Sequence, residues 1–224
     1  MTSFQRARSE EQREIRRQAI LDTAAAMLDE MPVSAVSLNE LSRRAGLAKS
    51  NVMRYFESRE AILLELLDRA WTGWTTGLPA LLSDRIDPTA GVGERGEQFA
   101  AAITASVTGR SVLCDLFSAQ AGVLEHNVSS EVAARYKRAA LANVAELAAL
   151  ADAHLPELGD EASELAAFTI MSIGAVWTHA RPSQAMLTAY EADPSLAARK
   201  MDFATSLRQL LATLTAGALA RASR

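Results

Sequence analysis

Residues 37–56 constrain the fold of this chain more than any other stretch. They read SLNELSRRAGLAKSNVMRYF. Ser37 and Glu40 have the spacing of a capping box, which begins a helix. Gly46 supplies the backbone freedom for a tight turn into a second short helix. The small side chain of Ser42 fits a close crossing, so the stretch predicts two short helices packed at a steep angle.

The apolar positions give this helix pair an inner and an outer side. Val52 and Phe56 are four residues apart and therefore share one face of the second helix. The inward set comprises Leu38, Leu41, Ala45, Leu47, Val52 and Tyr55. The opposite face presents Ser50, Asn51, Met53 and Arg54. In a helix-turn-helix these residues meet the major groove of DNA. The alternative is an ordinary helical hairpin with a solvated, charged face.

Net charge is distributed unevenly, which favours DNA binding although the chain as a whole carries −4. Residues 1–60 hold 10 Lys and Arg against 9 Asp and Glu, a net of +1, and residues 61–224 hold 13 against 18, a net of −5. Within 43–59 only Glu57 is acidic, and the basic residues are Arg43, Arg44, Lys49, Arg54 and Arg59. A local basic face on an acidic body discourages non-specific coating of DNA.

Helical spacing continues through the rest of the chain and predicts an all-α fold of about nine helices. A first helix starts at a capping box on Ser9 after a disordered segment at 1–8, buries Ile15, Ala19 and Ile20, and stops at Pro32. Ser58 caps a fourth helix that weakens near Gly77 and Pro79. After a loop at 84–93, further helices are expected at about 94–109, 111–126, 130–154, 160–180 and 194–220, with caps at Ser129 or Ser130, at Asp160 and at Asp193.

The stretch after the turn, GLAKSNVMRYFESREAI at 46–62, resembles the TetR family of bacterial helix-turn-helix regulators. Members of that family share a motif like G-V-S-x-x-x-L-Y-x-Y-F-x-S-K-E-x-L, and the resemblance covers about residues 10–70. It implies an N-terminal arm and DNA-binding domain at 1–57. It also implies a larger helical domain at 58–224 for effector binding and dimerisation.

The resemblance also implies DNA contacts, position by position. Recognition-helix positions that touch bases or nearby phosphates hold Lys49, Ser50, Asn51 and Met53. Tyr55 and Arg59 stand where the family contacts backbone phosphate, and Ser37 and Arg43 are lesser phosphate contacts. Asn51 has the chemistry to pair with adenine and Arg54 with guanine, although either side chain also suits a phosphate.

Two departures from the family motif leave the operator sequence open. Met53 replaces the usual tyrosine and removes a hydroxyl contact. Ala48 replaces the usual serine, so the recognition helix lacks its common cap, at a cost of about 1 kcal/mol.

In the C-terminal half, the resemblance implies a small-molecule effector whose binding changes the separation of the two recognition helices. Large aromatic side chains with a few polar groups are typical of a mostly apolar pocket. The candidate lining is Trp71, Trp74, Phe99, Ile103, Phe117, Gln120, Tyr136, Phe168, Met171 and Trp177. The alternative is that these side chains only fill a core. No ring of charges indicates a charged effector.

Dimerisation is expected because operator palindromes mirror two-fold protein symmetry. In the family the last two long helices pair into a four-helix bundle, and here these are about 160–180 and 195–219. The candidate interface is Ile170, Ile173, Gly174, Phe203, Leu207, Leu210, Leu211 and Leu214. The alternative is that these residues are buried within one subunit.

No cofactor, metal or membrane span is expected. The three histidines, His126, His154 and His179, have no partner at metal-binding spacing. The single cysteine, Cys114, fits a reducing cytoplasm and is interpreted as a small buried apolar residue, with a thiol sensor as the alternative. No Gly-rich phosphate loop or nucleophile–base pair indicates an enzyme. The sequence therefore predicts a cytoplasmic homodimeric repressor that binds double-stranded palindromic DNA and is released by a small, largely apolar effector. The alternative is a DNA-binding regulator without an effector, controlled by a protein partner or by abundance.

Overall fold

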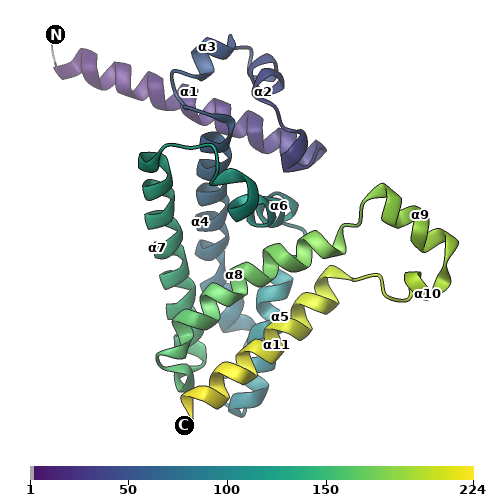
Figure 1. The fold of residues 1–224 in the computed structure, drawn as a ribbon. Coiled ribbons are helices and arrows are strands. Elements are labelled where there is room, and N and C mark those ends of the chain that lie inside the picture. Colours follow the sequence, from purple (N-terminus) through teal and green to yellow (C-terminus); the bar gives the residue numbers. More distant parts are fainter. Residues whose placement is uncertain (1–2) are drawn as a thin grey trace.

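A computed structural model describes residues 3–224, with side chains described from Glu10 onward. Over this range the chain forms eleven α-helices and no strand, which confirms the all-α prediction (Figure 1). Helices α1 to α3 form a head at one end of the molecule, and α4 runs from the head into a body formed by the remaining helices.

The head contains α1 (Ser3–Glu30), a 3-10 turn η1 (Val33–Ala35), α2 (Leu38–Arg44) and α3 (Lys49–Val52). The expected disordered segment and the capping box at Ser9 were wrong, because α1 is already helical from Ser3; residues 1–2 lie outside the described range. Ile15, which is 62% exposed, and Ala19 lie on the surface rather than in the core, and burial in α1 begins at Ile20. The first half of α1 extends past the other helices of the head (Figure 1).

Helix α4 (Arg59–Arg85) connects the head to the body. Ser58 caps it as predicted, since its hydroxyl accepts a hydrogen bond from the Ala61 backbone N–H at 3.0 Å. The expected weakening near Gly77 and Pro79 does not occur. Leu78 and Leu82 are buried at 1% and 0% exposure on either side of this point. Their burial offsets the backbone hydrogen bond that proline cannot donate.

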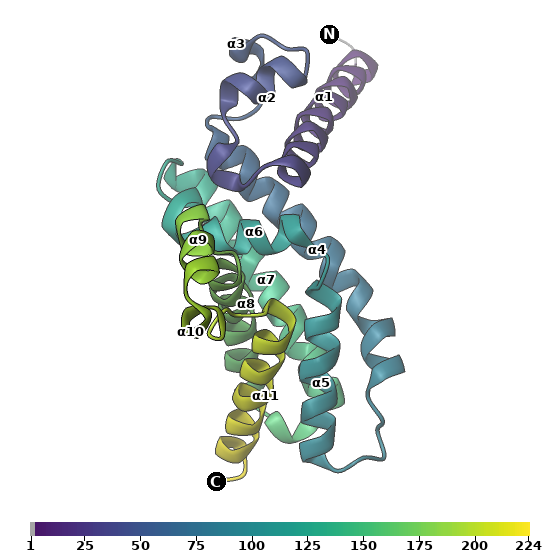
Figure 2. The same ribbon diagram turned by 90° about the vertical axis from the view of Figure 1, so that its right-hand side faces the viewer.

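The body packs around α8 (Glu161–Ala180), which contacts α6 (Ser111–Ala119), α7 (Ser130–His154) and α11 (Phe203–Ala222). Helix α5 (Val92–Val107) lies between α4 and α11, as Figure 2 shows from the side. A π-helical turn, η2 (Gln120–Leu124), continues α6, and a 3-10 turn, η3 (Pro156–Leu158), precedes α8. Ser129 caps α7 as predicted, whereas Asp160 makes no side-chain cap.

Helices α6 and α8 cross closely at Gly174. A Cβ atom at this position would lie 3.0 Å from the Phe117 carbonyl oxygen and 3.2 Å from the Ser118 nitrogen. Such distances are shorter than van der Waals contact and the obstructing atoms are backbone. Glycine therefore sets the separation between these two helices.

The C-terminal segment differs from the single helix expected from residue 194 onward. Helix α9 (Gln184–Ala192) and the short α10 (Pro194–Ala197) form an arm that projects from the body, and neither helix has a buried residue (Figure 1). Asp193 caps α10 as predicted. A second cap at Asp202, which accepts from the Thr205 N–H at 2.8 Å, starts α11 anew. The break was missed because only the first of these two cap signals was recognised.

The buried apolar side chains of head and body form one cluster. It extends from Ile20 in α1 through α4 to Ala218 in α11. Among the described residues no single helix is long and apolar enough to cross a membrane; only α5 and the segment Ser111–Leu124 reach that threshold together, with a bend of 99° between them.

Candidate nucleic-acid interface and ligand cavity

The helix-turn-helix forms as its local signals predict. Ser37 accepts a hydrogen bond from the Glu40 N–H at 3.2 Å and starts α2. Gly46 has φ of 65°, a left-handed conformation that favours glycine, and the chain then turns into α3. Ala48 stands at the N-cap of α3 without a side-chain hydrogen bond. Helix α3 proper is shorter than expected, and residues 53–55 continue it as a turn.

The inner and outer faces of α3 also agree with the sequence pattern. Val52 is 0% exposed and Phe56 is 3% exposed, so both anchor the motif to the core. The residues proposed to face the DNA groove are all exposed: Lys49, Ser50, Asn51, Met53 and Arg54. Tyr55 is half-buried and packs against the core cluster.

Two of the expected basic residues are neutralised within the head. Glu40 accepts hydrogen bonds from Arg43 at 2.6 Å and from Arg44 at 2.8 Å. These contacts lower the pKa of Glu40 to about 2. Arg44 also contacts Glu30 at 2.7 Å. The sequence count of basic residues therefore overstated the positive charge that α2 offers to a phosphate.

Arg59, expected to contact phosphate, is partly engaged inside the protein. Its Nη1 donates to the Val36 carbonyl oxygen at 2.9 Å and its Nε donates to Glu60 at 3.0 Å. Only 20% of its side chain is exposed. Arg59 thus ties the start of α4 to the segment before α2, and its Nη2 is the nitrogen left for a phosphate.

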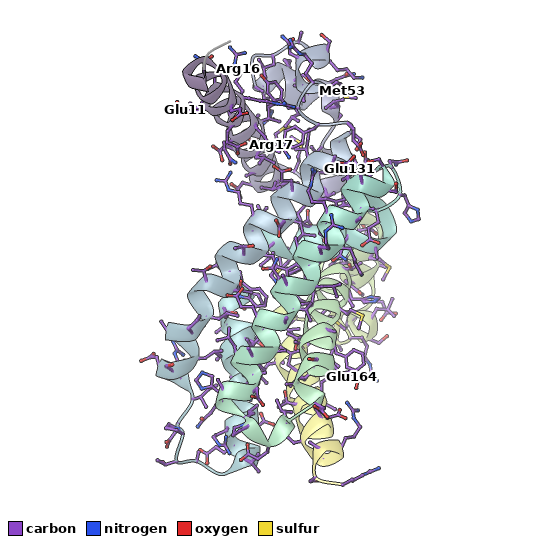
Figure 3. All side chains as sticks on the ribbon, turned by 90° about the vertical axis from the view of Figure 1, so that its left-hand side faces the viewer. Glu11, Arg16, Arg17, Met53, Glu131 and Glu164 are labelled. Atoms are coloured by element: carbon purple, nitrogen blue, oxygen red, sulfur yellow. The ribbon has the colours of Figure 1, made fainter. Side chains whose placement is uncertain are left out.

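Two arginines that the sequence reading did not assign lie beside the recognition helix. Arg13 and Arg16 of α1 line a surface cleft together with Arg54 and Tyr55. Figure 3 shows Arg16 on the side of α1 that faces α2 and α3, with Glu11 on the other side. Among the described side chains no carboxylate forms an ion pair with Arg13, Arg16 or Arg54. The three-residue spacing of Arg13 and Arg16, which places both on one helix face, was the available signal.

Arg17, the next residue along α1, has a structural role. It donates to Glu65 and, at 3.0 Å, to the Tyr55 carbonyl oxygen. Its guanidinium lies 4.3 Å from the centre of the Phe56 ring. These contacts join α1, α4 and the end of the recognition segment into one rigid unit.

A cavity of about 520 Å³ lies between α4, α6, α7 and α8 in the body. Four of the expected lining residues border it: Trp71, Phe117, Gln120 and Met171. Ala140, Val144 and Ile170 extend its apolar wall, and Lys137 and Glu125 bring charge to its edge. The wall contributed by η2 is π-helical, a conformation frequently found at functional sites.

The other six expected lining residues lie elsewhere, because they belong to the core or to other contacts. Trp74, Phe99 and Ile103 are at most 2% exposed within the core. Tyr136 borders a separate cleft between α4 and α7. Phe168 and Trp177 on α8 also lie outside the cavity lining.

The two tryptophans of α4 differ in how their indole N–H groups are satisfied. Trp74 donates to the Ser106 hydroxyl at 2.8 Å. Trp71 is 2% exposed, and among the described residues its Nε1 has no hydrogen-bond partner. Both rings meet Phe117 edge-on, at centroid distances of 4.9 Å for Trp71 and 6.4 Å for Trp74.

The expected dimer interface is only partly on the surface. Ile173, Leu207 and Leu211 are 0–2% exposed, and Gly174 packs against α6, so these four are internal contacts of the subunit. Ile170 is 7% exposed and lines the cavity. The expectation failed here because α8 is covered on three sides by its own subunit. The partly or fully exposed members are Phe203, Leu210 and Leu214.

Asp115 of α6 bonds to both the head and the end of α8. Its Oδ2 accepts from the Val33 N–H at 3.1 Å, at the start of η1. Its Oδ1 accepts from Trp177 Nε1 at 3.0 Å and from Arg181 at 2.9 Å. The Arg181 guanidinium also lies 5.0 Å from the Trp177 ring centre. One carboxylate therefore connects α6, η1 and α8.

Cys114 matches the interpretation of a buried apolar residue. It is 0% exposed, and burial raises the pKa of its thiol to about 12, with Asp115 adding to the shift. A thiol that stays protonated at neutral pH is a poor nucleophile. Among the described residues no group of three or more His, Cys, Asp or Glu side chains is arranged to hold a metal ion.

Comparison with known families assigns both regions of the chain. Residues 20–66 match the family model of bacterial regulatory proteins of the tetR family, and residues 68–222 match the Tetracyclin repressor-like C-terminal domain. The chain belongs to the TetR family of helix-turn-helix transcriptional regulators.

Individual relatives resemble this chain either in the sequence of a short segment or in the overall fold. The regulator EthR of Mycobacterium tuberculosis is 43% identical over 51 residues, which are 23% of this chain and 24% of EthR. A transcriptional regulator from Pseudomonas aeruginosa PAO1 shares the fold with a TM-score of 0.54 at 15% identity, covering 92% of this chain and 91% of that one. FadR from Bacillus subtilis, solved in complex with stearoyl-CoA, has a TM-score of 0.51 at 13% identity, covering 87% and 97%.

Proposed function

We propose that this protein is a dimeric repressor that binds a palindromic operator through α3 and leaves it when a small, largely apolar molecule occupies the body cavity. The observation that carries the DNA-binding proposal is the exposed outer face of α3. Its side chains are exposed and form no ion pair with a described residue, while its inner face is locked into the core. Exposed polar side chains on a rigid helix are what base recognition requires.

Bases and phosphates are contacted by different side chains in this proposal. Asn51 and Arg54 face the major groove and supply sequence preference, with Lys49, Ser50 and Met53 beside them. Tyr55, Ser37, Arg43 and Arg59 contact phosphates around this face. Arg13 and Arg16 extend the positive surface along α1, where no carboxylate among the described side chains neutralises them.

Binding-site selection with the purified protein and random double-stranded DNA tests the proposal. A palindrome with half-sites about one helical turn apart is the expected result, because a dimer places two recognition helices in successive major grooves. Absence of any enriched sequence would contradict DNA recognition. Asn51→Ala should then relax preference at particular base pairs, whereas a uniform loss across sequences would assign Asn51 to phosphate.

The salt dependence of DNA binding distinguishes arginines that are free to contact phosphate from arginines already paired with a carboxylate. Arg16→Ala should weaken binding to all sequences and lower the slope of log affinity against log salt by about 1. Arg43→Ala should change the slope less, because Glu40 already neutralises that guanidinium. Arg85→Ala, at the far end of α4, is the matched control and should leave the slope unchanged. Equal effects of all three variants would contradict a localised phosphate surface.

Contacts between α6, α8 and the head provide a path by which a ligand in the cavity can move the head. Phe117 and Ser118 of α6 and Gly174 and Thr178 of α8 all border the cavity. A ligand that separates α6 from α8 also acts on Asp115, which bonds to Trp177 and to the Val33 N–H of the head. For such a repressor, the coupling free energy between ligand binding and DNA binding is typically about 1–3 kcal/mol.

The proposed dimer uses the uncovered stripes of α8 and α11. Met171 is 59% exposed and Leu210 is 36% exposed, although both are apolar. Leu214 and Phe203 lie on the same side of α11 as Leu210 at helical spacing, although both are partly buried against the core and Phe203 meets the Trp177 ring at 5.0 Å. Leu210→Glu should therefore shift the protein from dimer to monomer in analytical ultracentrifugation, and an unchanged sedimentation coefficient would exclude this face.

A further inference from the structure

Glu57 is the one acidic residue of the basic stretch 43–59, and it directly follows the helix-turn-helix. It stands between Phe56, the buried anchor of the motif, and Ser58, the N-cap of α4. A carboxylate facing the DNA here would repel phosphates. The structure gives Glu57 a different contact, because its Oε1 accepts a hydrogen bond from the Ser129 backbone N–H at 2.6 Å, at the start of α7.

The start of α7 lacks half of a capping box, and Glu57 supplies the missing half. In a capping box the N-cap hydroxyl accepts from the third helical N–H, and a Glu or Gln at that third position accepts from the N-cap N–H. The Ser129 hydroxyl accepts from the Val132 N–H at 3.3 Å, but a valine side chain has no acceptor to return. Glu57, 72 residues away along the chain, accepts from the Ser129 N–H instead. The dipole of α7 also favours a carboxylate at this end.

The Glu57 bond connects the recognition segment (residues 49–55) to a part of the body other than α4. Among the described residues, two hydrogen bonds join the chain before α4 to α6 or to the start of α7. One is the bond from the Val33 N–H to Asp115, and the other is the bond from the Ser129 N–H to Glu57. Figure 3 shows this end of α7, marked by Glu131, next to the head. Of the two bonds, the Glu57 bond is the one beside the recognition segment.

We infer that Glu57 is a positioning residue for DNA binding, because its bond to the N-cap of α7 fixes the orientation of the recognition segment relative to the body. This inference rests on the proposed function. In a dimer on a palindrome, the orientation of each head sets the separation of the two recognition segments and therefore the half-site spacing that fits.

The orientation of the head can be measured without DNA. Spin labels on Ser50→Cys in α3 and Asp152→Cys in α7 occupy exposed positions on the head and the body. The native Cys114 is 0% exposed and should stay unlabelled. Dilution into excess unlabelled protein restricts double electron–electron resonance to distances within one subunit. Glu57→Ala should widen or shift the distance distribution relative to protein with wild-type Glu57.

Substitutions at both ends of the bond separate its effect from that of the α7 cap. Ser129→Pro removes the N–H, and the φ of −67° at this position suits proline. Ser129→Ala is its control, since it removes only the cap hydroxyl. Glu57→Ala and Ser129→Pro should change the distribution alike, and the double variant should change it no further, because both remove one bond. Glu57→Gln keeps an acceptor oxygen without the charge and should be intermediate.

The consequence for DNA is measured as a ratio of two affinities, one for the selected operator and one for the same operator with a base pair inserted between its half-sites. Glu57→Ala should lower this ratio by about 3- to 10-fold. The general gain in affinity from removing a negative charge cancels in the ratio. Glu11→Ala, which removes an exposed carboxylate on the side of α1 away from α2 and α3, is the matched control and should leave the ratio unchanged (Figure 3).

Failure of the inference and failure of the proposed function give different results. An unchanged distance distribution in Glu57→Ala would overturn the inference, whether or not the protein selects an operator. A changed distribution with an unchanged affinity ratio would overturn the part of Glu57 in DNA positioning. A changed distribution in a protein that selects no palindrome would support the part of Glu57 in holding the head and contradict the proposed function.

Discussion

The outer face of α3 and the cavity in the body place the side chains proposed to bind DNA and ligand in opposite surroundings. Asn51 and Arg54 are exposed, and no ion pair with a described residue fixes Arg54. Trp71 and Phe117 belong to the same buried cluster that stabilises the fold. A substitution on α3 can therefore alter DNA recognition at little cost in stability, whereas a substitution in the cavity wall also changes the packing of α4 and α6.

Under the proposed function, DNA preference and ligand preference therefore differ in how freely they can vary. The five exposed residues of α3 and its turn, which are proposed to contact DNA, can change while the body stays the same. The ligand preference of the proposed effector cavity cannot change as freely, because some of its lining side chains, such as Trp71 and Phe117, also fill the core. Relative to exposed residues, core truncations should therefore have large effects on the free energy of unfolding.

Leu63→Ala should have the largest effect on stability. Leu63 is 0% exposed on α4, the helix that carries the core from head to body. We expect the free energy of unfolding to fall by about 2–5 kcal/mol, measured by urea titration at fixed protein concentration. Leu141→Ala is the control, since Leu141 is 59% exposed, and it should change stability by at most about 0.5 kcal/mol. Separate transitions by circular dichroism and tryptophan fluorescence would show that head and body do not unfold as one unit.

Asp115→Ala should weaken the connection between body and head. It leaves the Val33 and Trp177 N–H groups without their acceptor and should cost about 1.5–3 kcal/mol. If Asp115 holds the head in position, the variant should also discriminate less between operators whose half-site spacing differs by one base pair. The control Asp152→Ala, at an exposed position of α7, should alter neither property. Lost stability with unchanged spacing preference would restrict Asp115 to a structural role.

Gly174→Ala tests the separation of α6 and α8 at the cavity. The added methyl group meets the backbone of Phe117 and Ser118, so we expect a loss of about 1–3 kcal/mol. Gly77→Ala is matched, because it is also a helical glycine, but no atom beyond its own stretch of helix lies within 4 Å of the added Cβ. It should raise stability by up to about 1 kcal/mol through helix propensity. Stabilisation by both substitutions in urea unfolding would show that the two helices can separate without cost.

The sequence predicted the head better than the body for a physical reason. In the head, short-range signals determine the structure: the Ser37 and Ser58 caps, the Gly46 turn and the Val52–Phe56 face all lie within a few residues of what they control. The charge count failed for two reasons. One is local: Glu40 pairs with Arg43 and Arg44, three and four residues away, and the count left this pairing out. The other is contact between distant residues. The pairing of Arg44 with Glu30 and the approach of Arg16 to Arg54 join residues far apart in the chain.

In the body the helical patterns show that a face is apolar but not which neighbouring helix it contacts. Helix α8 is apolar nearly all round, so its sequence did not distinguish the side against α6 from the side open to a partner. Ile173 and Gly174 were therefore assigned to the dimer interface, and the structure buries both. Similarly, Trp71 and Trp74 have equivalent sequence signals, and only the position of Ser106 on α5 separates the bonded indole from the unbonded one.

Ala48→Ser should have the smallest of these effects and the opposite sign. Ala48 has the extended conformation of an N-cap but no side-chain oxygen, with φ of −63° and ψ of 144°. A serine at this position can accept from the free N–H groups of α3 and should add up to about 1 kcal/mol of stability, measured by thermal unfolding. The reverse change at a working cap, Ser37→Ala, should remove a similar amount. Because Ala48 lies beside Lys49 and Ser50, operator affinity should be measured in parallel. A gain in stability with unchanged affinity would show that recognition by α3 and stability of the head vary independently, and a loss of affinity would show that the uncapped helix end is itself part of the DNA interface.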